Sequence, residues 1–149
     1  MLRRSLHVLV LAVGLVISMG CSTEGDSEVI GKVPPPLVDS TWLADDISGA
    51  GIVGGAQASL AFHPDGRVAG SGGCNRYSGI VFGDGDDALS FHDLGSTLKA
   101  CDVLIDDQER RFFDALNATR SYRFQDPGHH LVLIGANGSP LMRLSQQAP

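Results

Sequence analysis

The stretch "GSGGCNRYSG", residues 70–79, carries the strongest structural signal in this chain of 149 residues. Glycine-rich loops that bind phosphate keep a spaced glycine pattern or a lysine at the start of a helix. Here Gly72 and Gly73 are followed directly by Cys74 and Asn75, and no Gly-Lys-Ser or Gly-Lys-Thr sequence comes next. We therefore interpret the glycines as a strand end, where glycine marks a bulge or a second backbone passing close.

The sequence on both sides of this stretch alternates between apolar and polar residues and is divided by turn signals. "ASLAF" and "RVAGS", joined by the turn "HPDG", predict one β-hairpin, and "SGIVF" and "ALSFHDL", joined by "GDGDD", predict a second. "STWLADDI" predicts an earlier strand in which Trp42 is a core anchor. "TRSYRF", "HLVLIG" and "PLMRLS" predict the closing strands.

Between these two groups of strands the apolar period changes to that of a helix. Apolar side chains recur at helical spacing after Cys101, at Ile105, Phe112, Phe113 and Leu116. Asp106, with Glu109 three residues later, resembles a capping box and predicts the helix start. The expected fold is mainly β, of the α+β class: an antiparallel sheet or partial barrel of about seven or eight short strands, with one amphipathic helix covering an open end.

Residues 1–20 have the features of a lipoprotein signal peptide. Arg3 and Arg4 precede an apolar run at residues 6–17, which is shorter than the ~20 residues that a membrane-spanning helix needs. The sequence "ISMGC" then resembles the lipobox of bacterial lipoproteins, which predicts cleavage after Gly20 and lipid modification of Cys21. Several acyl chains on one cysteine provide a stable membrane anchor.

The rest of the chain divides into a tether and one domain. Residues 21–38 lack aromatic residues and contain three consecutive prolines, so we expect a flexible tether there and a domain over residues 39–146. Removing residues 1–20 takes away Arg3 and Arg4 from the 11 basic residues and none of the 17 acidic ones, which leaves a formal charge of −8. This charge argues against nucleic acid as a partner. We expect a bacterial cell-envelope protein, lipid-anchored and extracytoplasmic, on the periplasmic face of the outer membrane if the organism has one.

With Cys21 assigned to the lipid, two cysteines remain, Cys74 and Cys101. In an oxidising compartment such a pair favours a disulfide, whose loop closure would stabilise the fold by about 3 to 4 kcal/mol. Two buried reduced thiols, or a reactive or metal-binding thiol site, remain as alternatives.

Several motifs together resemble the META domain family, which includes the HslJ-like heat-shock lipoproteins of bacteria. The matching parts are a loose W-x-L start at Trp42, the block "DGRVAGSGGCNRYSG", "STLKAC", "DQERRFFDAL", "LVLIG" and "LMRL". Lys99 departs from the methionine that relatives usually carry before Ala-Cys. The resemblance implies a β-rich fold with one helix and an envelope or stress-related role, and it brings no catalytic residues.

We expect neither catalysis nor a cofactor nor a bound metal. No GxSxG or HExxH signature occurs in the sequence. Asp84, Asp86 and Asp87 lack the spacing of a calcium loop, and the set His63, His92, His129 and His130 lacks ligand spacing on one element.

Two functions remain. The first is a non-catalytic, monomeric envelope domain that binds a protein or another envelope component. The alternative is a carrier or sensor of an apolar ligand in a partial-barrel cavity with aromatic walls, formed by Trp42, Phe62, Phe82, Phe91 and Phe112.

Overall fold

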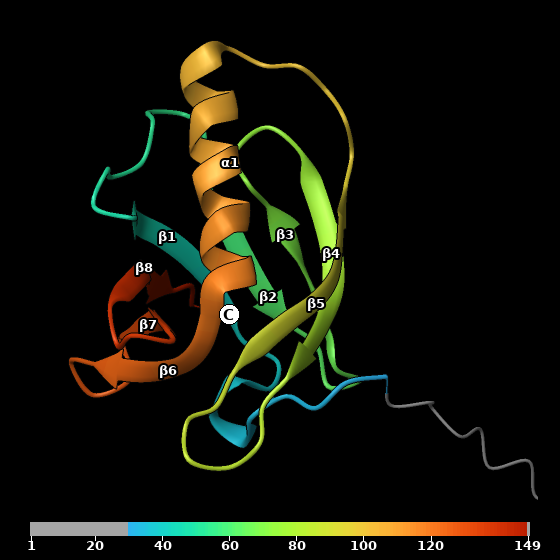
Figure 1. The fold of residues 1–149 in the computed structure, drawn as a ribbon, viewed down its shortest axis with the longest axis vertical. Coiled ribbons are helices and arrows are strands. Elements are labelled where there is room, and N and C mark those ends of the chain that lie inside the picture. Colours follow the sequence, from blue (N-terminus) through green and yellow to red (C-terminus); the bar gives the residue numbers. More distant parts are fainter. Residues whose placement is uncertain (1–29, 149) are drawn as a thin grey trace, which may run out of the picture.

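The computed structural model describes residues 30–148, which form eight strands, one α-helix and one short 3-10 helix (Figure 1). In chain order the elements are η1 (Pro35–Leu37), β1 (Thr41–Ile47), β2 (Ser59–Phe62), β3 (Arg67–Ser71), β4 (Arg76–Phe82), β5 (Ser90–Ser96), α1 (Val103–Ala118), β6 (Thr119–Gln125), β7 (His130–Gly135) and β8 (Pro140–Gln146). The expected fold class is confirmed. The predicted cleavage after Gly20 and the predicted lipid modification of Cys21 lie outside the described residues.

All eight strands belong to one antiparallel sheet with the order β5-β4-β3-β2-β1-β8-β7-β6. The predicted hairpins β2–β3 and β4–β5 are both present, and β6, β7 and β8 form a second meander. The two meanders are joined by β1 and β8, which pair although almost the whole domain separates them in sequence.

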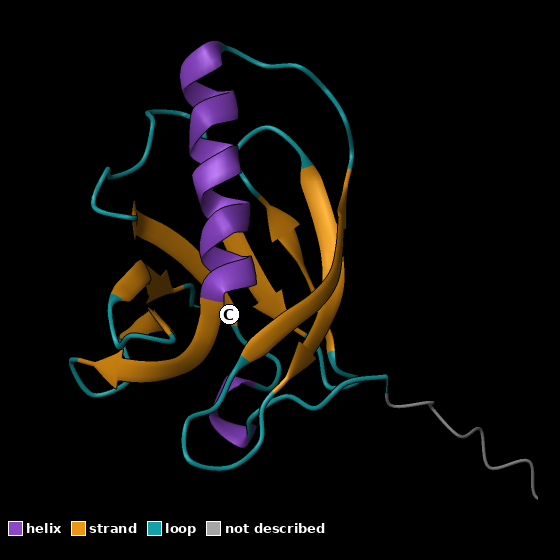
Figure 2. Ribbon diagram, viewed as in Figure 1, coloured by secondary structure: helices purple, strands orange, loops and turns teal. Residues whose placement is uncertain are grey.

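The sheet curls until its two edge strands approach each other at one end (Figure 2). There Ala88, just before β5, bridges to Ser121 of β6, and the backbone N–H of Leu89 donates to the carbonyl of Arg120 over 3.1 Å. Helix α1 runs from the β5 edge to the β6 edge and covers the part of the curl that remains open (Figure 1). The arrangement is a half-barrel plugged by one helix.

The interior of the half-barrel is a continuous apolar core. Trp42, Phe62 and Phe112 are among its fully buried side chains, contributed by β1, β2 and α1. The indole N–H of Trp42 donates to the Ser40 hydroxyl over 2.8 Å, so this large side chain is buried with its polar atom satisfied. Trp42 is the core anchor that its sequence context predicts.

Helix α1 begins four residues earlier than the predicted capping box. Its N-cap is Asp102, whose carboxylate accepts from the Leu104 N–H over 3.1 Å. The prediction that Asp106 and Glu109 cap the helix is wrong, because Glu109 lies on the buried face and bonds to another loop. In the described part of the chain, no helix combines the length and the hydropathy needed to span a bilayer.

The segment before β1 packs on the domain rather than hanging free. Leu37 is fully buried, and Lys32 forms a parallel bridge with Phe82 of β4. Gly31 makes this approach possible, since a Cβ there would lie 2.5 Å from the carbonyl oxygen of Val81. The folded part of the chain therefore starts before residue 39.

Candidate functional site

The glycine-rich stretch is a socket for two polar side chains of α1. A Cβ on Gly72 would lie 2.7 Å from Glu109 Cγ, and one on Gly73 would lie 2.5 Å from Gln108 Nε2. Gly73 also has a φ of +120°, which side chains rarely allow. Gly70 has a different role, because its Cβ would lie 2.2 Å from the Ser59 carbonyl on the neighbouring strand. The expected close backbone approach is therefore confirmed at Gly70, whereas the next two glycines make room for the helix.

Asn75 is the centre of a buried hydrogen-bond network beneath this socket. Its side-chain N–H groups donate to Glu109 Oε1 over 2.7 Å and to the Lys99 carbonyl over 3.0 Å. Its Oδ1 accepts from the Thr97 hydroxyl over 2.7 Å and from the Lys99 N–H over 2.8 Å. One side chain thus joins the glycine-rich loop, the segment after β5 and the helix.

Glu109 and Gln108 complete the same network from the helix side. Glu109 Oε2 accepts from the backbone N–H groups of Cys74 and Asn75, over 3.1 and 2.6 Å. Gln108 is fully buried; its Oε1 accepts from the Val53 N–H and its Nε2 donates to the Ala56 carbonyl, both over 2.7 Å. Hydrogen bonds to an ionised carboxylate are among the stronger ones, so the glycine-rich loop is held rigidly against α1.

A disulfide bond joins Cys74 to Cys101 beside this network. It links the end of the glycine-rich loop to the residue just before the N-cap of α1. The Asp106 carboxylate lies next to it, because its Oδ1 accepts from the Cys101 N–H over 3.1 Å. The favoured sequence prediction for these two cysteines is confirmed.

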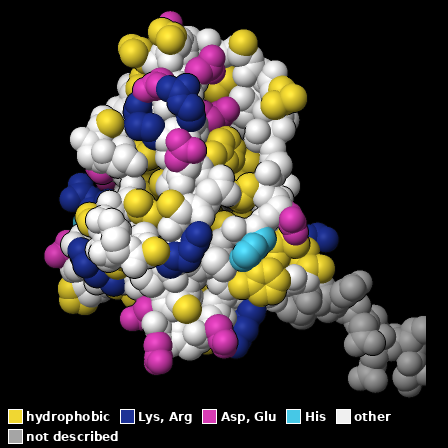
Figure 3. Space-filling view, in the orientation of Figure 1, with side chains coloured by type: hydrophobic (Ala, Val, Ile, Leu, Met, Phe, Trp, Pro, Cys, Tyr) yellow, Lys and Arg dark blue, Asp and Glu magenta, His cyan; other side chains and the backbone are white. Residues whose placement is uncertain are grey.

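Exposed apolar side chains lie on the segment that leads into α1 and in the first turn of the helix. Leu98, Val103 and Leu104 are 95%, 76% and 64% exposed, and we call these three residues the tip surface. Figure 3 shows hydrophobic side chains along this upper end, interspersed with charged ones. A shallow hollow of about 430 Å³ lies below them, between the segment 96–100 and the helix residues Glu109, Arg110 and Phe113.

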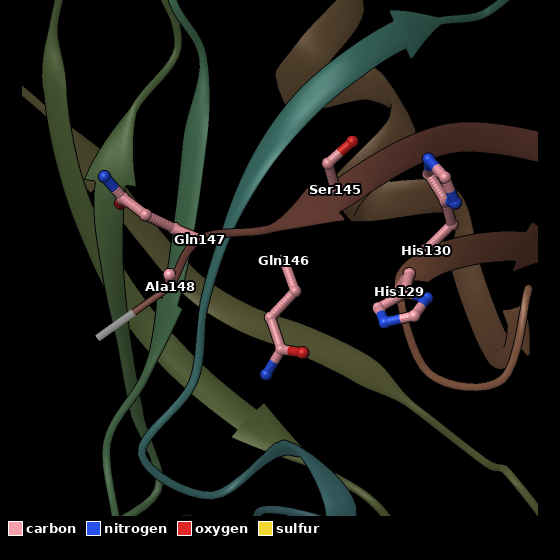
Figure 4. A pocket seen from close by; sticks show the side chains of 6 residues that line it. All are labelled: His129, His130, Ser145, Gln146, Gln147 and Ala148. Atoms are coloured by element: carbon pink, nitrogen blue, oxygen red, sulfur yellow. The ribbon is translucent and has the colours of Figure 1, made fainter.

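A second hollow, of about 460 Å³, is lined by His129, His130, Ser145, Gln146, Gln147 and Ala148 (Figure 4). Serine, histidine and aspartate meet beside it, but not in the order of a nucleophilic triad. The Ser145 hydroxyl donates directly to Asp45 Oδ2 over 2.5 Å, whereas His130 Nε2 lies 3.7 Å from the same oxygen. In a catalytic triad the imidazole lies between the serine and the carboxylate. Among residues 30–148, no imidazole lies within hydrogen-bond distance of this hydroxyl.

The aromatic residues predicted to wall a ligand cavity do not act together. Trp42, Phe62 and Phe112 are at most 2% exposed and pack in the core, and Phe91 is nearly as buried. Phe82 is on the outer surface, where its ring lies edge-on to that of His92. These side chains fill the half-barrel rather than surround an opening.

The candidate metal ligands considered from the sequence also stay apart. Asp84 forms an ion pair with Lys32 at 3.0 Å, and His92 lies within hydrogen-bond distance of the Ser90 hydroxyl. Among residues 30–148, the three metal-ligating side chains that come close together are instead Cys74, Cys101 and Asp106.

Sequence reasoning missed the roles of Gln108, Glu109 and Asp106. A signal for the first two was present, because residues 108 and 109 lie one turn before Phe112 and thus on the apolar stripe of the helix. Polar residues on an apolar stripe need buried partners, and the glycine-rich loop supplies them. No comparable signal marks Asp106, whose position beside the disulfide follows from how the helix start meets the loop.

Comparisons with known proteins identify a family and two solved structures that this chain resembles. A family model described as the META domain matches residues 35–148. A protein from Burkholderia xenovorans solved by NMR is 26% identical, covering 84% of this chain and 97% of its own, with a TM-score of 0.59. A crystal structure of a DUF4847 family protein from Bacteroides vulgatus is 15% identical, covering 76% and 96%, with a TM-score of 0.57, and shows a similar fold. No protein with a curated description matches significantly.

Proposed function

Because this chain belongs to the META domain family, we propose that it is a lipid-anchored protein of the bacterial cell envelope whose domain binds a protein partner and catalyses no reaction. The structural observation that carries the proposal is the tip surface, where large apolar side chains are exposed to solvent. Exposed apolar groups on an ordered surface are typical of interaction sites.

The tip surface is preorganised for binding. Leu98 lies between Thr97 and Lys99, both of which bond to Asn75, and Val103 follows the disulfide-bonded Cys101 by two residues. A partner would therefore order few additional side chains when it docks, which lowers the entropy cost of association.

The charges around the tip surface indicate the chemistry of the partner. Asp102 is the N-cap of α1, where its carboxylate accepts from the Leu104 N–H, and Asp106 lies in the first turn. We infer a protein partner with an apolar patch bordered by lysine or arginine, because opposite charges at the rim steer association and fix orientation.

Two features support the anchored, extracytoplasmic location. The sequence "ISMGC" at residues 17–21 resembles a lipobox. The Cys74–Cys101 bond belongs to a class that persists in oxidising compartments. In Figure 1 the blue segment that leads into η1 lies toward the lower end of the view, away from the start of α1 at the top, so an upstream anchor would leave the tip surface free for a partner.

Site-specific photo-crosslinking in the native host tests both parts of the proposal. We expect a crosslinker at Leu98 to capture one envelope protein that a crosslinker at Phe82, an exposed apolar residue at the end of β4, does not capture. Leu104→Asp should reduce this capture. A separate fractionation experiment tests the anchor: Cys21→Ser should move the folded domain from the membrane to the soluble fraction. Equal capture from Leu98 and Phe82 contradicts the partner site, and unchanged membrane partitioning of Cys21→Ser contradicts the anchor.

A further inference from the structure

We propose that Cys74, Cys101 and Asp106 form a zinc-binding site when the disulfide between the two cysteines is reduced. One ligand atom from each of these residues lies within 4.8 Å of the other two. In the oxidised protein the two sulfur atoms bond to each other, so the site is closed. Reduction converts a structural cross-link into a set of three ligands at the start of α1.

The two cysteines are held close together by contacts that do not depend on the bridge. On one side, Glu109 Oε2 accepts from the Cys74 N–H over 3.1 Å. On the other side, Asp106 Oδ1 accepts from the Cys101 N–H over 3.1 Å. Asn75 joins the two sides, because it bonds to both Glu109 and Lys99. The backbone on each side of the site therefore stays in place after the S–S bond is broken.

The distances suit a shared metal ion. The Cα atoms of Cys74 and Cys101 are 6.0 Å apart. Zinc–sulfur bonds of about 2.3 Å in tetrahedral geometry put two thiolates roughly 3.8 Å from each other, which side-chain rotation provides without movement of the backbone.

The ligand types select zinc among common divalent ions. Thiolates favour soft or borderline ions over magnesium and calcium, and zinc accepts two thiolates and a carboxylate in one tetrahedral site. Cys101 is exposed, so water can occupy the fourth position. Glu109 is not free to be that ligand, since its two oxygens already accept from three N–H groups.

A dithiol reductant supplies the two electrons and two protons that open the site. Its first thiolate attacks the Sγ of Cys101, the more exposed of the two residues, which forms a mixed disulfide and releases Cys74 as a thiol after protonation. Its second thiol displaces Cys101 and leaves the reductant as a cyclic disulfide. Zinc then binds both sulfurs as thiolates, and the two thiol protons go to solvent.

A cobalt titration of the reduced full chain tests the proposal. The chain carries Cys21→Ser, which removes the third thiol, has no affinity tag, and is reduced anaerobically with a phosphine because dithiols themselves bind metal. We expect one Co²⁺ per chain with thiolate-to-cobalt charge-transfer absorption, displaced by Zn²⁺, and no such absorption for the oxidised chain. Asp106→Asn should weaken Zn²⁺ binding about tenfold or more, the size of effect known for groups that support a metal.

Matched variants separate this site from nonspecific binding. Asp107→Asn changes the next residue, which pairs with Arg110 and Arg111, and should leave zinc affinity unchanged. Cys101→Ala should abolish the charge-transfer band. The proposal is overturned if the folded, reduced chain takes up no cobalt, if binding survives Cys101→Ala, or if Asp107→Asn weakens it as much as Asp106→Asn. It is equally overturned if circular dichroism shows that reduction unfolds the chain and zinc does not restore the fold.

Discussion

Asn75 is the residue on which the region around the glycine-rich loop depends most. It is 4% exposed, and both its amide nitrogen and its amide oxygen are fully used. An amide is suited to this position because it donates to a carboxylate on one side and accepts from an N–H and a hydroxyl on the other. Neither a carboxylate nor an aliphatic side chain has both abilities.

Asn75→Asp should therefore destabilise the domain strongly at neutral pH. The substitution removes two donors and puts a second carboxylate oxygen where Nδ2 now lies 2.7 Å from Glu109 Oε1. We expect a loss of about 3 kcal/mol or more at pH 7, measured by urea denaturation.

Asn137→Asp is the matched control for this substitution. Asn137 lies in the exposed turn between β7 and β8, where its Oδ1 accepts from the Ser139 N–H over 3.0 Å, a role that aspartate keeps. Its stability should change by no more than about 0.5 kcal/mol. If Asn75→Asp lost as little stability as Asn137→Asp, the Asn75 network would contribute little to the stability of the domain.

At the scale of elements, α1 is joined to the sheet in two chemically different ways. Its second half packs through Phe112, Ala115 and Leu116, which are buried in the core. Its first half is held by the polar side chains of Gln108 and Glu109 and by the disulfide before its N-cap. The helix start can therefore present exposed apolar groups to a partner while the rest of the helix secures the half-barrel.

Removing the disulfide should weaken this attachment without unfolding the domain. The bridge spans 27 residues, a loop for which chain entropy gives a stabilisation of about 3.5 kcal/mol. Cys74→Ala should cost about the same as Cys74→Ala combined with Cys101→Ala, because the single substitution already breaks the bond. Denaturation curves of the oxidised, reduced and substituted proteins measure the difference.

Mass spectrometry checks the bond itself. Alkylation of the oxidised domain under denaturing conditions, without prior reduction, should add no alkyl group at Cys74 or Cys101. Two added groups would mean free thiols and would contradict the bridge.

At the scale of the whole molecule, closure of the curled sheet decides which polar groups are buried. The backbone of β6 reaches back to the turn before β5, where the Tyr122 N–H donates to the Asp87 carbonyl over 2.9 Å. Helix α1 closes the remaining opening above Tyr77, whose ring meets those of Phe112 and Phe113 edge-on. Tyr77 is thereby enclosed, and burial raises the pKa of its hydroxyl far above the usual value.

This enclosure predicts how stability depends on alkaline pH. In the unfolded chain Tyr77 ionises near pH 10, but in the folded protein burial keeps its hydroxyl protonated, so its pKa is raised on folding. The unfolded state then binds fewer protons than the folded state, and stability is lost as pH rises above about 10, by up to about 1.4 kcal/mol per pH unit. Urea denaturation between about pH 8 and 11 measures this slope.

Tyr77→Phe should make the alkaline slope shallower. It should also cost about 1 kcal/mol at neutral pH, because the Tyr77 hydroxyl donates to the Ser59 carbonyl over 3.0 Å. Tyr122→Phe is the comparison variant, since the pKa of Tyr122 is also raised, by burial and by the charge of Asp87. An unchanged slope in Tyr77→Phe would contradict the buried, protonated state of this residue.

The sequence by itself determined the elements of this protein, because strands, turns and amphipathic helices leave local periodic patterns. The hairpins β2–β3 and β4–β5, the core position of Trp42 and the pairing of Cys74 with Cys101 all follow from such patterns and from the count of cysteines. Only the tertiary structure decided that β1 pairs with β8 and that Glu109 enters the glycine-rich loop. It also decided that Asp106 lies beside the disulfide. Each of these arrangements brings together segments far apart in the chain, β1 with β8 and the helix start with the glycine-rich loop, and their formation depends on how the whole sheet curls, which no local period records.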